Sequence, residues 1–418
     1  MATDRLRIAF LGHVDHGKST LIGRLLCDTG SFPPDRMEQL RLASVAQGSE
    51  MEFAYLVDQL REEREQAMTI DTARLFFRTV EREYLVIDAP GHREFLKNML
   101  TGASQADAAV LIVDASQGIG EQTRRHAFLL SLLGIRCCVV AVNKMDLVGY
   151  SEARFLDVRG AVHDLTGRLG LACTACVPIS AKLGDNVVVG SEHMPWYDGP
   201  AILDAIAAVP AARDTDLPLR FCVQDVYHFN GRRIVAGRVL SGSLAPGARI
   251  VVLPDEQATQ VVSVERFQSA RTVAEAGECV GLTLPDEVSV RRGQVLCDPG
   301  DLPRVTSGLR VELFWMSPNP LSKRERLPLR LSTQEAECQI ARIRRRVDSA
   351  SLDVLEEDAA LLGDAEVGEL DLALATPVVV EPFSRIPPLG RVVLERDGNI
   401  VGAGVVTDIT PHEGQGAQ

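Results

Sequence analysis

An eight-residue segment near the amino terminus, Gly12–Ser19, constrains the fold of this chain more than any other feature. Its sequence, Gly-His-Val-Asp-His-Gly-Lys-Ser, fits the pattern G-x-x-x-x-G-K-[ST]. It follows a short apolar run, Arg7–Leu11, that reads as a buried strand, and it opens a predicted helix, Ser19–Thr29. A strand, a glycine-rich turn and a helix in this order are typical of an α/β domain with a mainly parallel sheet.

This loop has the residues that a phosphate-binding site needs. Glycines let backbone N–H groups turn inward around phosphates, and the helix amino terminus adds positive potential. Lys18 can reach the β- and γ-phosphates of a nucleotide, and the Ser19 hydroxyl can bind Mg²⁺. We therefore predict that the nucleotide phosphates contact His13, Val14, Asp15, His16, Gly17, Lys18, Ser19 and Thr20.

The first 210 residues continue the alternation of short apolar runs and helical patterns. Such alternation predicts βαβ units, with helices covering a mainly parallel sheet. The further predicted strands are Tyr84–Ile87, Ala108–Val113, Cys137–Val142 and Val177–Ile179. The further predicted helices are His92–Gly102, Glu121–Gly134 and Tyr150–Gly170.

After Pro210 the pattern changes to short strands separated by Gly/Pro turns, which predicts antiparallel barrels or sandwiches. The first group of predicted strands is Arg220–Tyr227, Arg233–Leu240, Arg249–Leu253, Val261–Gln268 and Glu278–Leu284. Residues 298–305 read as a linker to a second all-β stretch that extends to Ile409. We expect three domains: a nucleotide-binding domain at 1–210, a β-barrel at 211–300 and a second β-barrel at 301–418.

Composition narrows the class of protein. With 46% hydrophobic and 24% charged residues, the chain is ordinary globular protein rather than extended disorder. The net charge of −13 argues against general binding of nucleic acid. The nine cysteines are odd in number and scattered, which argues against a disulfide framework. No leader-like segment or long apolar run is visible, so we expect a cytoplasmic protein that does not span a membrane.

Two later motifs identify the base. Asn143-Lys144-Met145-Asp146 follows a predicted strand, and Asp146 can accept both N1–H and the 2-amino group of guanine, a donor pair that adenine lacks. Asn143 can bond the N7/O6 edge, while the stem of Lys144 covers the purine face. Ser180, Ala181 and Lys182 follow a further strand and can offer a backbone N–H to O6. The nucleotide is therefore predicted to be GTP or GDP rather than ATP.

The hydrolytic residues are expected in two segments between these motifs. Asp88-Ala89-Pro90-Gly91-His92 ends a predicted strand, so Asp88 would hold Mg²⁺ through water, the Gly91 N–H would sense the γ-phosphate, and His92 would orient the attacking water. A switch segment must supply a threonine to Mg²⁺ when the γ-phosphate is present. Thr69 is the candidate, and Thr72 is a nearby competitor.

Two weaker features carry alternatives. Cys173 and Cys176 have a C-x-x-C spacing, but a zinc site would need two more ligands and only His193 lies nearby downstream, so we favour structural packing. Four arginines at 342 and 344–346 precede an acidic stretch from Asp348 to Asp371 without Lys or Arg. This stretch is either a solvated strand face or a surface for docking a partner.

The motif set as a whole resembles the translation-factor-type GTPases. The loop at 12–20, the segment at 88–92 and the segment at 143–146 look like those of the Tu-type and archaeal elongation factors. The opening of the second predicted domain at 218–226 and the close of the third at 390–394 and 403–406 also resemble theirs. The resemblance covers nearly the whole chain and implies a GTPase domain followed by two β-barrels.

Within that group the chain is more similar to the large, GTP-hydrolysing subunit of heterodimeric ATP sulfurylase. The stretches that carry this resemblance are 17–26, 122–126 with 132–135, 143–152, and 314–316 with 343–348. The resemblance implies GTP, GDP and Mg²⁺ as ligands and a small catalytic subunit as partner, in a heterodimer or larger assembly. That partner would form adenylyl sulfate, since this sequence has neither an S-G-G-x-D-type ATP loop nor a second G-x-x-x-x-G-K-[ST] motif.

The chain departs from the sulfurylase pattern at two places. The phosphate loop reads Asp15-His16-Gly17, the translation-factor form, where sulfurylase subunits usually have two aspartates before the glycine. Ala67 and Met68 precede Thr69 where the family has Gly-Ile, so Val14 and Met68 would form the hydrophobic gate beside His92. Methionine is more pliable than isoleucine, which bears on the basal hydrolysis rate.

Three functions are compatible with these residues. The first is the GTPase subunit of a sulfate-activating complex, in which GTP hydrolysis drives adenylyl sulfate synthesis by the small subunit. The second is a translation factor that carries aminoacyl-tRNA. The third is a GTP-gated scaffold with negligible turnover. The sequence specifies neither the GTPase activator nor the oligomeric state.

Overall fold

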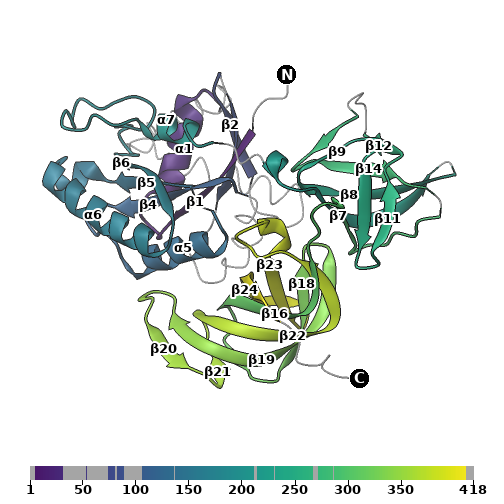
Figure 1. The fold of residues 1–418 in the computed structure, drawn as a ribbon. Coiled ribbons are helices and arrows are strands. Elements are labelled where there is room, and N and C mark those ends of the chain that lie inside the picture. Colours follow the sequence, from purple (N-terminus) through teal and green to yellow (C-terminus); the bar gives the residue numbers. More distant parts are fainter. Residues whose placement is uncertain are drawn as a thin grey trace. The chain divides into compact units, whose positions relative to one another are not determined.

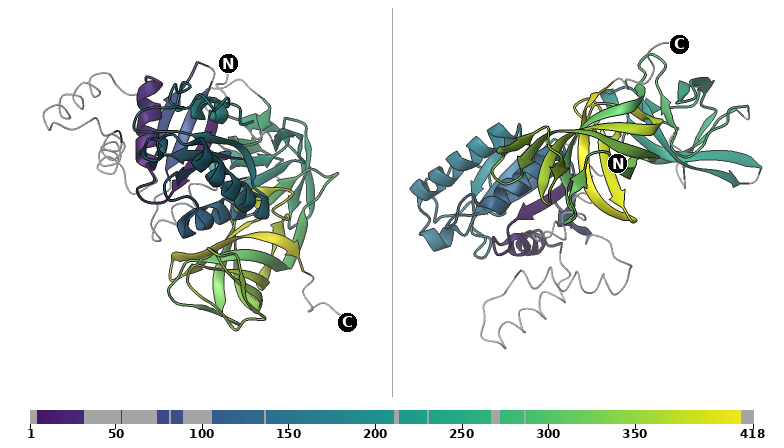
Figure 2. Two further views of the ribbon diagram at one scale, coloured as in Figure 1. Left: turned by 90° about the vertical axis from the view of Figure 1, so that its left-hand side faces the viewer. Right: turned by 90° about the horizontal axis from the view of Figure 1, so that it is seen from below.

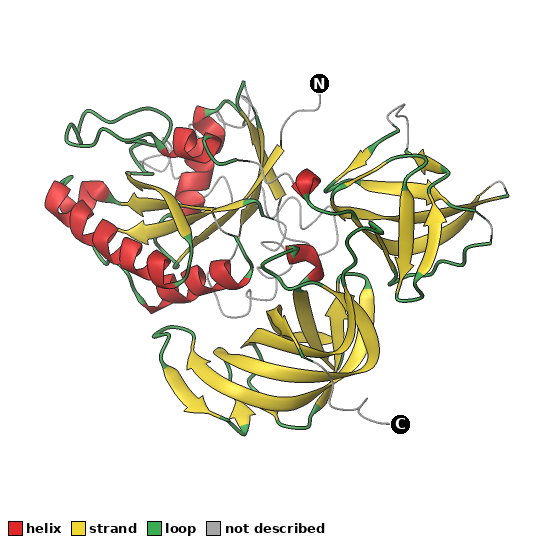
Figure 3. Ribbon diagram, viewed as in Figure 1, coloured by secondary structure: helices red, strands yellow, loops and turns green. Residues whose placement is uncertain are grey.

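The computed structural model describes residues 5–31, 53, 74–80, 82–88, 106–135, 137–210, 214–229, 231–266, 272–285 and 287–410. The chain divides into two compact units, Met1–Ala211 and Ala212–Gln418 (Figure 1). The first contains the described α-helices, and the second is built almost wholly of strands (Figure 3).

The first unit is built on a six-stranded sheet in the order β2-β3-β1-β4-β5-β6. Every described pairing in it is parallel except that of β2 with β3. The strands are β1 (Arg5–Gly12), β2 (Arg74–Arg78), β3 (Glu83–Asp88), β4 (Ala108–Asp114), β5 (Cys137–Asn143) and β6 (Ala172–Pro178). The fold class predicted for this half of the chain is confirmed.

Helices cover both faces of this sheet. They are α1 (Lys18–Asp28), α5 (Glu121–Leu132), α6 (Glu152–Arg168) and α7 (Ile202–Ala207), with a short 3₁₀ turn, η2 (Met145–Val148). Apolar residues of α1 and α7 pack on the even-numbered side chains of β1 and β4. Helices α5 and α6 contact each other and lie on the opposite face (Figure 1). Because both faces are covered, all seven residues of β4 are buried, as expected for a central parallel strand.

The carboxyl ends of the parallel strands converge at one edge of the sheet. Strand β1 ends at Gly12, β3 at Asp88, β4 at Asp114 and β5 at Asn143. The register pairs Asp114 with Asn143 across β4 and β5. Open α/β sheets bind ligands at this edge, and the phosphate and base motifs predicted from sequence both begin here.

The second unit begins with a short 3₁₀ turn, η3 (Asp214–Asp216), and a seven-stranded antiparallel sheet in the order β11-β10-β15-β7-β8-β14-β12. A two-stranded sheet, β13-β9, accompanies it. The strands are β7 (Arg220–Phe229), β8 (Arg232–Ser241), β9 (Ser243–Leu244), β10 (Arg249–Leu253), β11 (Gln257–Gln260), β12 (Ser263–Glu265), β13 (Ala274–Glu275), β14 (Cys279–Thr283) and β15 (Val295–Cys297).

The rest of the unit is an antiparallel barrel (Figure 2). Its sheet order is β18-β23-β24-β16-β22-β19-β20, and a pairing of β18 with β19 closes six of these strands into a ring. The strands are β16 (Arg304–Trp315), β17 (Leu321–Ser322), β18 (Arg326–Leu331), β19 (Gln334–Asp348), β20 (Val354–Glu357), β21 (Leu361–Leu362), β22 (Glu366–Val380), β23 (Arg391–Arg396) and β24 (Asn399–Ile409), with a 3₁₀ turn, η4 (Pro387–Leu389).

The two sheets of the second unit share a hydrophobic core. Cys222, Val251 and Leu253 of the first sheet belong to the same buried cluster as the interior of the closed barrel. Beside this cluster the side chain of Arg220, which is fully buried, donates to Glu381 at 2.6 Å and to Asp301 at 2.8 Å. Apolar packing and a buried ion pair therefore hold these two sheets together.

The predicted elements differ from the observed ones in a few places. The strand predicted at 177–179 corresponds to β6, most of which lies before that range. Of the strand predicted at 261–268, the described residues form only β12, Ser263–Glu265, and residues 267–268 lie outside the described ranges. Strand β2 was not predicted. The helix predicted at His92–Gly102 lies outside the described residues.

Candidate nucleotide-binding site

The predicted phosphate loop connects β1 to α1 at the carboxyl edge of the sheet. Gly17 has φ +88° and precedes the first residue of α1, and within the described structure no side chain caps this helix. A Cβ at Gly17 would lie 2.3 Å from Nδ2 of Asn143, so only glycine fits here. Lys18, Ser19 and Thr20 form the first turn of α1, whose amino terminus favours an anion.

Asn143 joins the predicted phosphate and guanine segments. Its Nδ2 donates to the carbonyl oxygen of His16 at 2.8 Å, and its Oδ1 accepts from the backbone N–H of Ala181 at 2.9 Å. The side chain is buried, with 2% of its surface exposed. The N–H of Ala181, which belongs to the segment 180–182 predicted to offer a backbone N–H to guanine O6, is engaged with Asn143 in this structure. The side-chain amide of Asn143 thus connects the phosphate loop, the end of β5 and the segment 180–182.

The base segment is held by a second contact between distant residues. The Ser180 hydroxyl donates to Oδ1 of Asp146 at 2.7 Å. This bond orients the carboxylate that is predicted to read the guanine N1–H and 2-amino group. Leu183 donates its N–H to the Ser180 hydroxyl at 3.4 Å, and Gly184 donates to the Ser180 carbonyl at 2.7 Å, which closes the turn 180–184 that also contains Lys182.

Lys144 is positioned by a residue that sequence reasoning missed. Its ammonium lies 2.8 Å from Oδ2 of Asp114, at the end of the neighbouring strand β4, and Lys144 itself adopts a left-handed conformation with φ +63°. The other carboxylate oxygen accepts from the N–H and hydroxyl of Ser116. Burial alone would raise the pKa of Asp114, but these hydrogen bonds from Lys144 and Ser116 outweigh it and lower the pKa.

Three histidines lie in or beside the phosphate loop. The rings of His13 and His16 meet edge to face with centroids 5.3 Å apart, and Nδ1 of His16 lies 3.3 Å from the carbonyl oxygen of Ile112. His126 of α5 is buried, and its Nδ1 has no hydrogen-bond partner among the described residues. Burial, reinforced by the nearby charge of Lys18, lowers the pKa of His126 to about 3. No sequence motif indicates a role for His126.

Several predicted site residues cannot be placed with the others. Thr69, Gly91 and His92 lie outside the described residues, as do Ala67 and Met68. Asp88 is the last residue of β3, which places its backbone at the same edge of the sheet as the phosphate loop. Val14 and Asp15 are described and are exposed on the loop.

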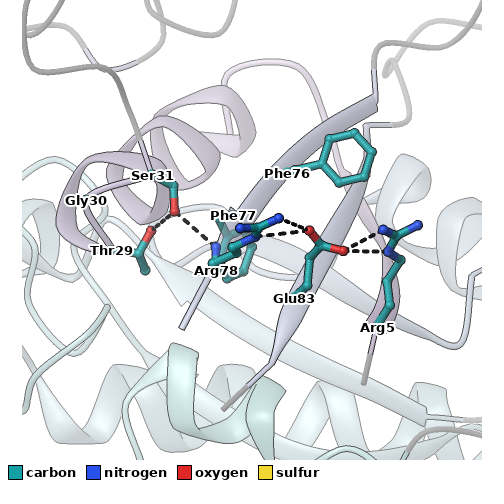
Figure 4. Close-up of a pocket in the computed structure, with 8 residues that line it drawn as sticks. All are labelled: Arg5, Thr29, Gly30, Ser31, Phe76, Phe77, Arg78 and Glu83. Atoms are coloured by element: carbon teal, nitrogen blue, oxygen red, sulfur yellow. Dashed lines mark hydrogen bonds and ion pairs between the residues drawn. The ribbon is translucent and has the colours of Figure 1, made fainter. Parts of the chain in front are cut away.

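A cavity of about 580 Å³ lies at the other edge of the sheet, lined by Arg5, Thr29, Gly30, Ser31, Phe76, Phe77, Arg78 and Glu83 (Figure 4). Arg5 and Glu83 are the first residues of β1 and β3, whereas the phosphate loop follows the end of β1. Both arginines pair with Glu83, at 2.6 and 3.0 Å. This cavity is therefore separate from the predicted nucleotide site.

The two cysteines of the C-x-x-C spacing lie on β6 and are free. Burial raises the pKa of Cys176 to about 12 and also raises that of Cys173, which keeps both thiols protonated. Within the described ranges, no group of three or more His, Cys, Asp or Glu side chains is arranged to hold a metal ion. None of the helices that the structure describes is long and apolar enough to cross a membrane.

The acidic stretch after Arg346 pairs largely with the arginines that precede it. Arg344 lies 2.7 Å from Asp371, and Arg346 lies 3.1 Å from Glu356 and 3.2 Å from Glu366. These contacts run across β19, β20 and β22, which are neighbours in one sheet. The charges therefore form ion pairs along a strand face, and both predicted interpretations of the stretch remain predictions.

Comparison with known protein families agrees with this geometry. Residues 3–214 match the elongation factor Tu GTP-binding domain, residues 232–297 match elongation factor Tu domain 2, and residues 308–407 match the GTP-eEF1A C-terminal domain-like family. The three matches cover both units of the chain.

Full-length relatives fall into two groups. Sulfate adenylyltransferase subunit 1 of Citrobacter koseri is 40% identical over 416 residues, covering 97% of this chain and 87% of the relative. The same subunit of Tolumonas auensis is 38% identical over 410 residues, covering 96% and 86%. Elongation factor 1-alpha of Archaeoglobus fulgidus is 37% identical over 418 residues, covering 98% and 99%. The chain therefore belongs to the family of elongation factor Tu-type GTPases.

Proposed function

We propose that this chain is the GTP-hydrolysing subunit of a sulfate adenylyltransferase. In this role it would bind a small catalytic subunit that transfers the adenylyl group of ATP to sulfate and releases pyrophosphate. Hydrolysis of GTP by this chain would supply free energy for that unfavourable transfer. The observation that carries the proposal is 40% identity over nearly the whole chain to a protein named for that enzyme.

The arrangement at the sheet edge supports a definite division of roles. Backbone groups of the loop at 13–20 and the side chain of Lys18 would hold the phosphates. Asp146, oriented by Ser180 at 2.7 Å, would read guanine, and Lys144 would cover its face. Asn143 would keep the phosphate and base segments in register through its contacts with His16 and Ala181.

Mg²⁺ fits the donors at this edge, because a hydroxyl and carboxylates are hard oxygen ligands. Ser19 lies in the first turn of α1 beside the loop, and β3 ends with Asp88 at the same edge. Ser19 and Thr69 would bind the ion directly and Asp88 through water. The ion would neutralise charge on the phosphates, Thr69 and Gly91 would sense the γ-phosphate, and His92 would orient the attacking water.

The proposed protein has three domains, at residues 1–210, 211–300 and 301–418, and a cytoplasmic location. The GTPase domain would change the position of its switch segments with the nucleotide state. The two barrels, joined by the Arg220–Glu381 contact, would transmit that change to the small subunit as one body.

A second candidate is a translation factor that binds aminoacyl-tRNA. The phosphate loop has the translation-factor sequence Asp15-His16-Gly17, and the archaeal elongation factor is covered to 99% of its length, against 87% for the sulfurylase subunit. The net charge of −13 weighs against binding a nucleic acid but does not forbid it.

Co-expression with the small subunit of a sulfate adenylyltransferase tests the two candidates. We expect the two chains to co-purify and to form adenylyl sulfate in a reaction that GTP accelerates. His92→Ala should slow GTP hydrolysis by orders of magnitude and leave GTP affinity nearly unchanged. Retention of charged tRNA in a GTP-dependent filter-binding assay, without adenylyl sulfate formation, would support the second candidate instead.

A further inference from the structure

Arg24 lies on α1 between two segments that are far apart in the sequence. Its Nε donates to Asp28, four residues later on the same helix, at 2.7 Å, and both side chains are about one quarter exposed. This i,i+4 pair directs the guanidinium along the helix. The flat group is thereby held in a fixed place rather than extended into solvent.

The guanidinium stacks on an aromatic ring. Cζ of Arg24 lies 5.0 Å from the ring centroid of Phe53, whose side chain is 7% exposed. The neighbouring residue on the helix is Gly23, where a Cβ would lie 2.2 Å from the carbonyl oxygen of Phe53. The backbone at Phe53 therefore lies directly on α1, at a place that only glycine allows.

The same guanidinium also meets the turn 180–184. Gly184 has φ +89°, and a Cβ there would lie 2.4 Å from Nη2 and 2.6 Å from Cζ of Arg24. Gly184 also donates to the carbonyl of Ser180 at 2.7 Å and so closes the turn that holds Asp146. Arg24 thus packs against the backbone of the segment that supports guanine recognition.

We propose that Arg24 is a positioning residue that joins the guanine-binding turn at 180–184 to Phe53. Loss of one of these two contacts then loosens the other, because a single guanidinium makes both. This inference rests on the assignment of the turn to guanine, and it adds a residue of α1 that supports the turn.

The dissociation of fluorescent GDP from the full chain tests this link. We expect Arg24→Ala and Phe53→Leu each to speed dissociation about tenfold, and the double variant to be no faster than either one, because both break the same contact. Arg24→Lys should behave like Arg24→Ala, since an ammonium lacks the planar group that contacts both the ring and the turn. Arg159→Ala is the matched control, because Arg159 stacks on Phe155 at 5.5 Å on α6, away from the site.

A second readout separates positioning from simple loss of helix stability. A loosened α1 would weaken the phosphate contacts that GDP and ADP share, so both affinities would fall together. A displaced guanine turn should lower the affinity for GDP about tenfold and leave that for ADP unchanged. Asp28→Asn, which removes the ion pair but keeps the guanidinium, should have a smaller effect than Arg24→Ala.

The proposal would be overturned if Arg24→Ala released GDP at the wild-type rate. It would also be overturned if the rate increase in the double variant were the product of the two single increases. An equal loss of GDP and ADP affinity would overturn it as well. The assay needs neither hydrolysis nor a partner, so its result is independent of whether the chain supports adenylyl sulfate formation.

Discussion

The side-chain amide of Asn143 donates a 2.8 Å hydrogen bond to the backbone carbonyl of His16, and so ties the end of strand β5 to the phosphate loop. The same side chain accepts from Ala181 at 2.9 Å. Two contacts that span 127 and 38 positions thus depend on one buried amide. The predicted phosphate and base segments are connected in one network, and each part of it can be tested separately.

Replacement of Asn143 by alanine should weaken binding of GTP and GDP alike. The change leaves two buried backbone groups without their partner, at a cost of about 1–3 kcal/mol each. Isothermal titration calorimetry should show a drop in affinity of at least tenfold. Asn399→Ala, at an exposed position of the second unit, should leave the affinity unchanged. Equal affinities in both variants would mean that the network does not support binding.

Gly17→Ala should disrupt the same network from the other side. Its Cβ would lie 2.3 Å from Nδ2 of Asn143, and φ is +88°. Gly30→Ala is a close control, because Gly30 also has positive φ, at +64°, but a Cβ there meets nothing within 4 Å of the described atoms. Nucleotide affinity should fall at least tenfold in the first variant only. A similar loss in both would assign the effect to backbone strain.

Asp146→Asn should change the base that the site selects. The proposal has the carboxylate, held by Ser180 at 2.7 Å, accept from the 2-amino group of guanine, whereas an asparagine amide can donate to the 2-carbonyl of xanthine. Competition binding should show weaker GTP binding and stronger XTP binding than in wild type. If the preference for GTP over ATP and XTP stayed unchanged, Asp146 would not read the base.

Acid should destabilise the first unit through His126. The pKa of this buried imidazole is about 3 in the folded protein, whereas an unfolded histidine titrates near ~6.5. The unfolded state then binds more protons, so the stabilisation is complete above pH ~6.5 and is lost as the pH falls toward 3. Urea unfolding between pH 7 and pH 5 should show this loss, and His126→Leu should reduce it.

The control for that titration is His163→Leu, because His163 is exposed on α6. Its pH dependence should match that of the wild type. A wild-type slope in His126→Leu would show that other groups are responsible for acid sensitivity.

The buried pair of Arg220 and Glu381 should dominate the stability of the second unit. Arg220→Met leaves Glu381, 2% exposed, without its main partner, at an expected cost of about 3–5 kcal/mol. The double variant Arg220→Met, Glu381→Leu should recover much of the lost free energy of unfolding. Arg326→Met breaks an exposed pair with Glu337 and should cost less than ~1 kcal/mol. Urea unfolding of the full chain gives the free energy of unfolding of each variant. If the losses in Arg220→Met and Glu381→Leu simply added in the double variant, the two residues would not act as a pair.

Much of the first unit could be predicted from the sequence because its strands are short apolar runs. Strands β4 and β5 were placed within a residue of their observed bounds. Strand β6 was misplaced because its residues, Ala172-Cys173-Thr174-Ala175-Cys176, are small and lack a β-branched pattern. Strand β2 was missed because two of its five residues are arginines, as befits a strand at the edge of a sheet.

The motif residues could be recognised because their chemistry is local, but their supports could not. Asp114 reaches Lys144 only because β4 and β5 are neighbours in register. His126 lies beside the phosphate loop through the packing of α5, and Arg24 meets Gly184 across 160 positions. These contacts depend on tertiary structure, and no spacing in the sequence indicates them.

The central claim is that GTP hydrolysis by this chain drives the formation of adenylyl sulfate. The most direct test is the final level of adenylyl sulfate reached by the purified two-subunit complex from ATP and sulfate, with and without GTP. The account predicts that GTP raises this level above the GTP-free equilibrium, and that a non-hydrolysable GTP analogue or His92→Ala does not. If GTP only shortens the time needed to reach the same level, hydrolysis is not coupled to the transfer and the claim is wrong.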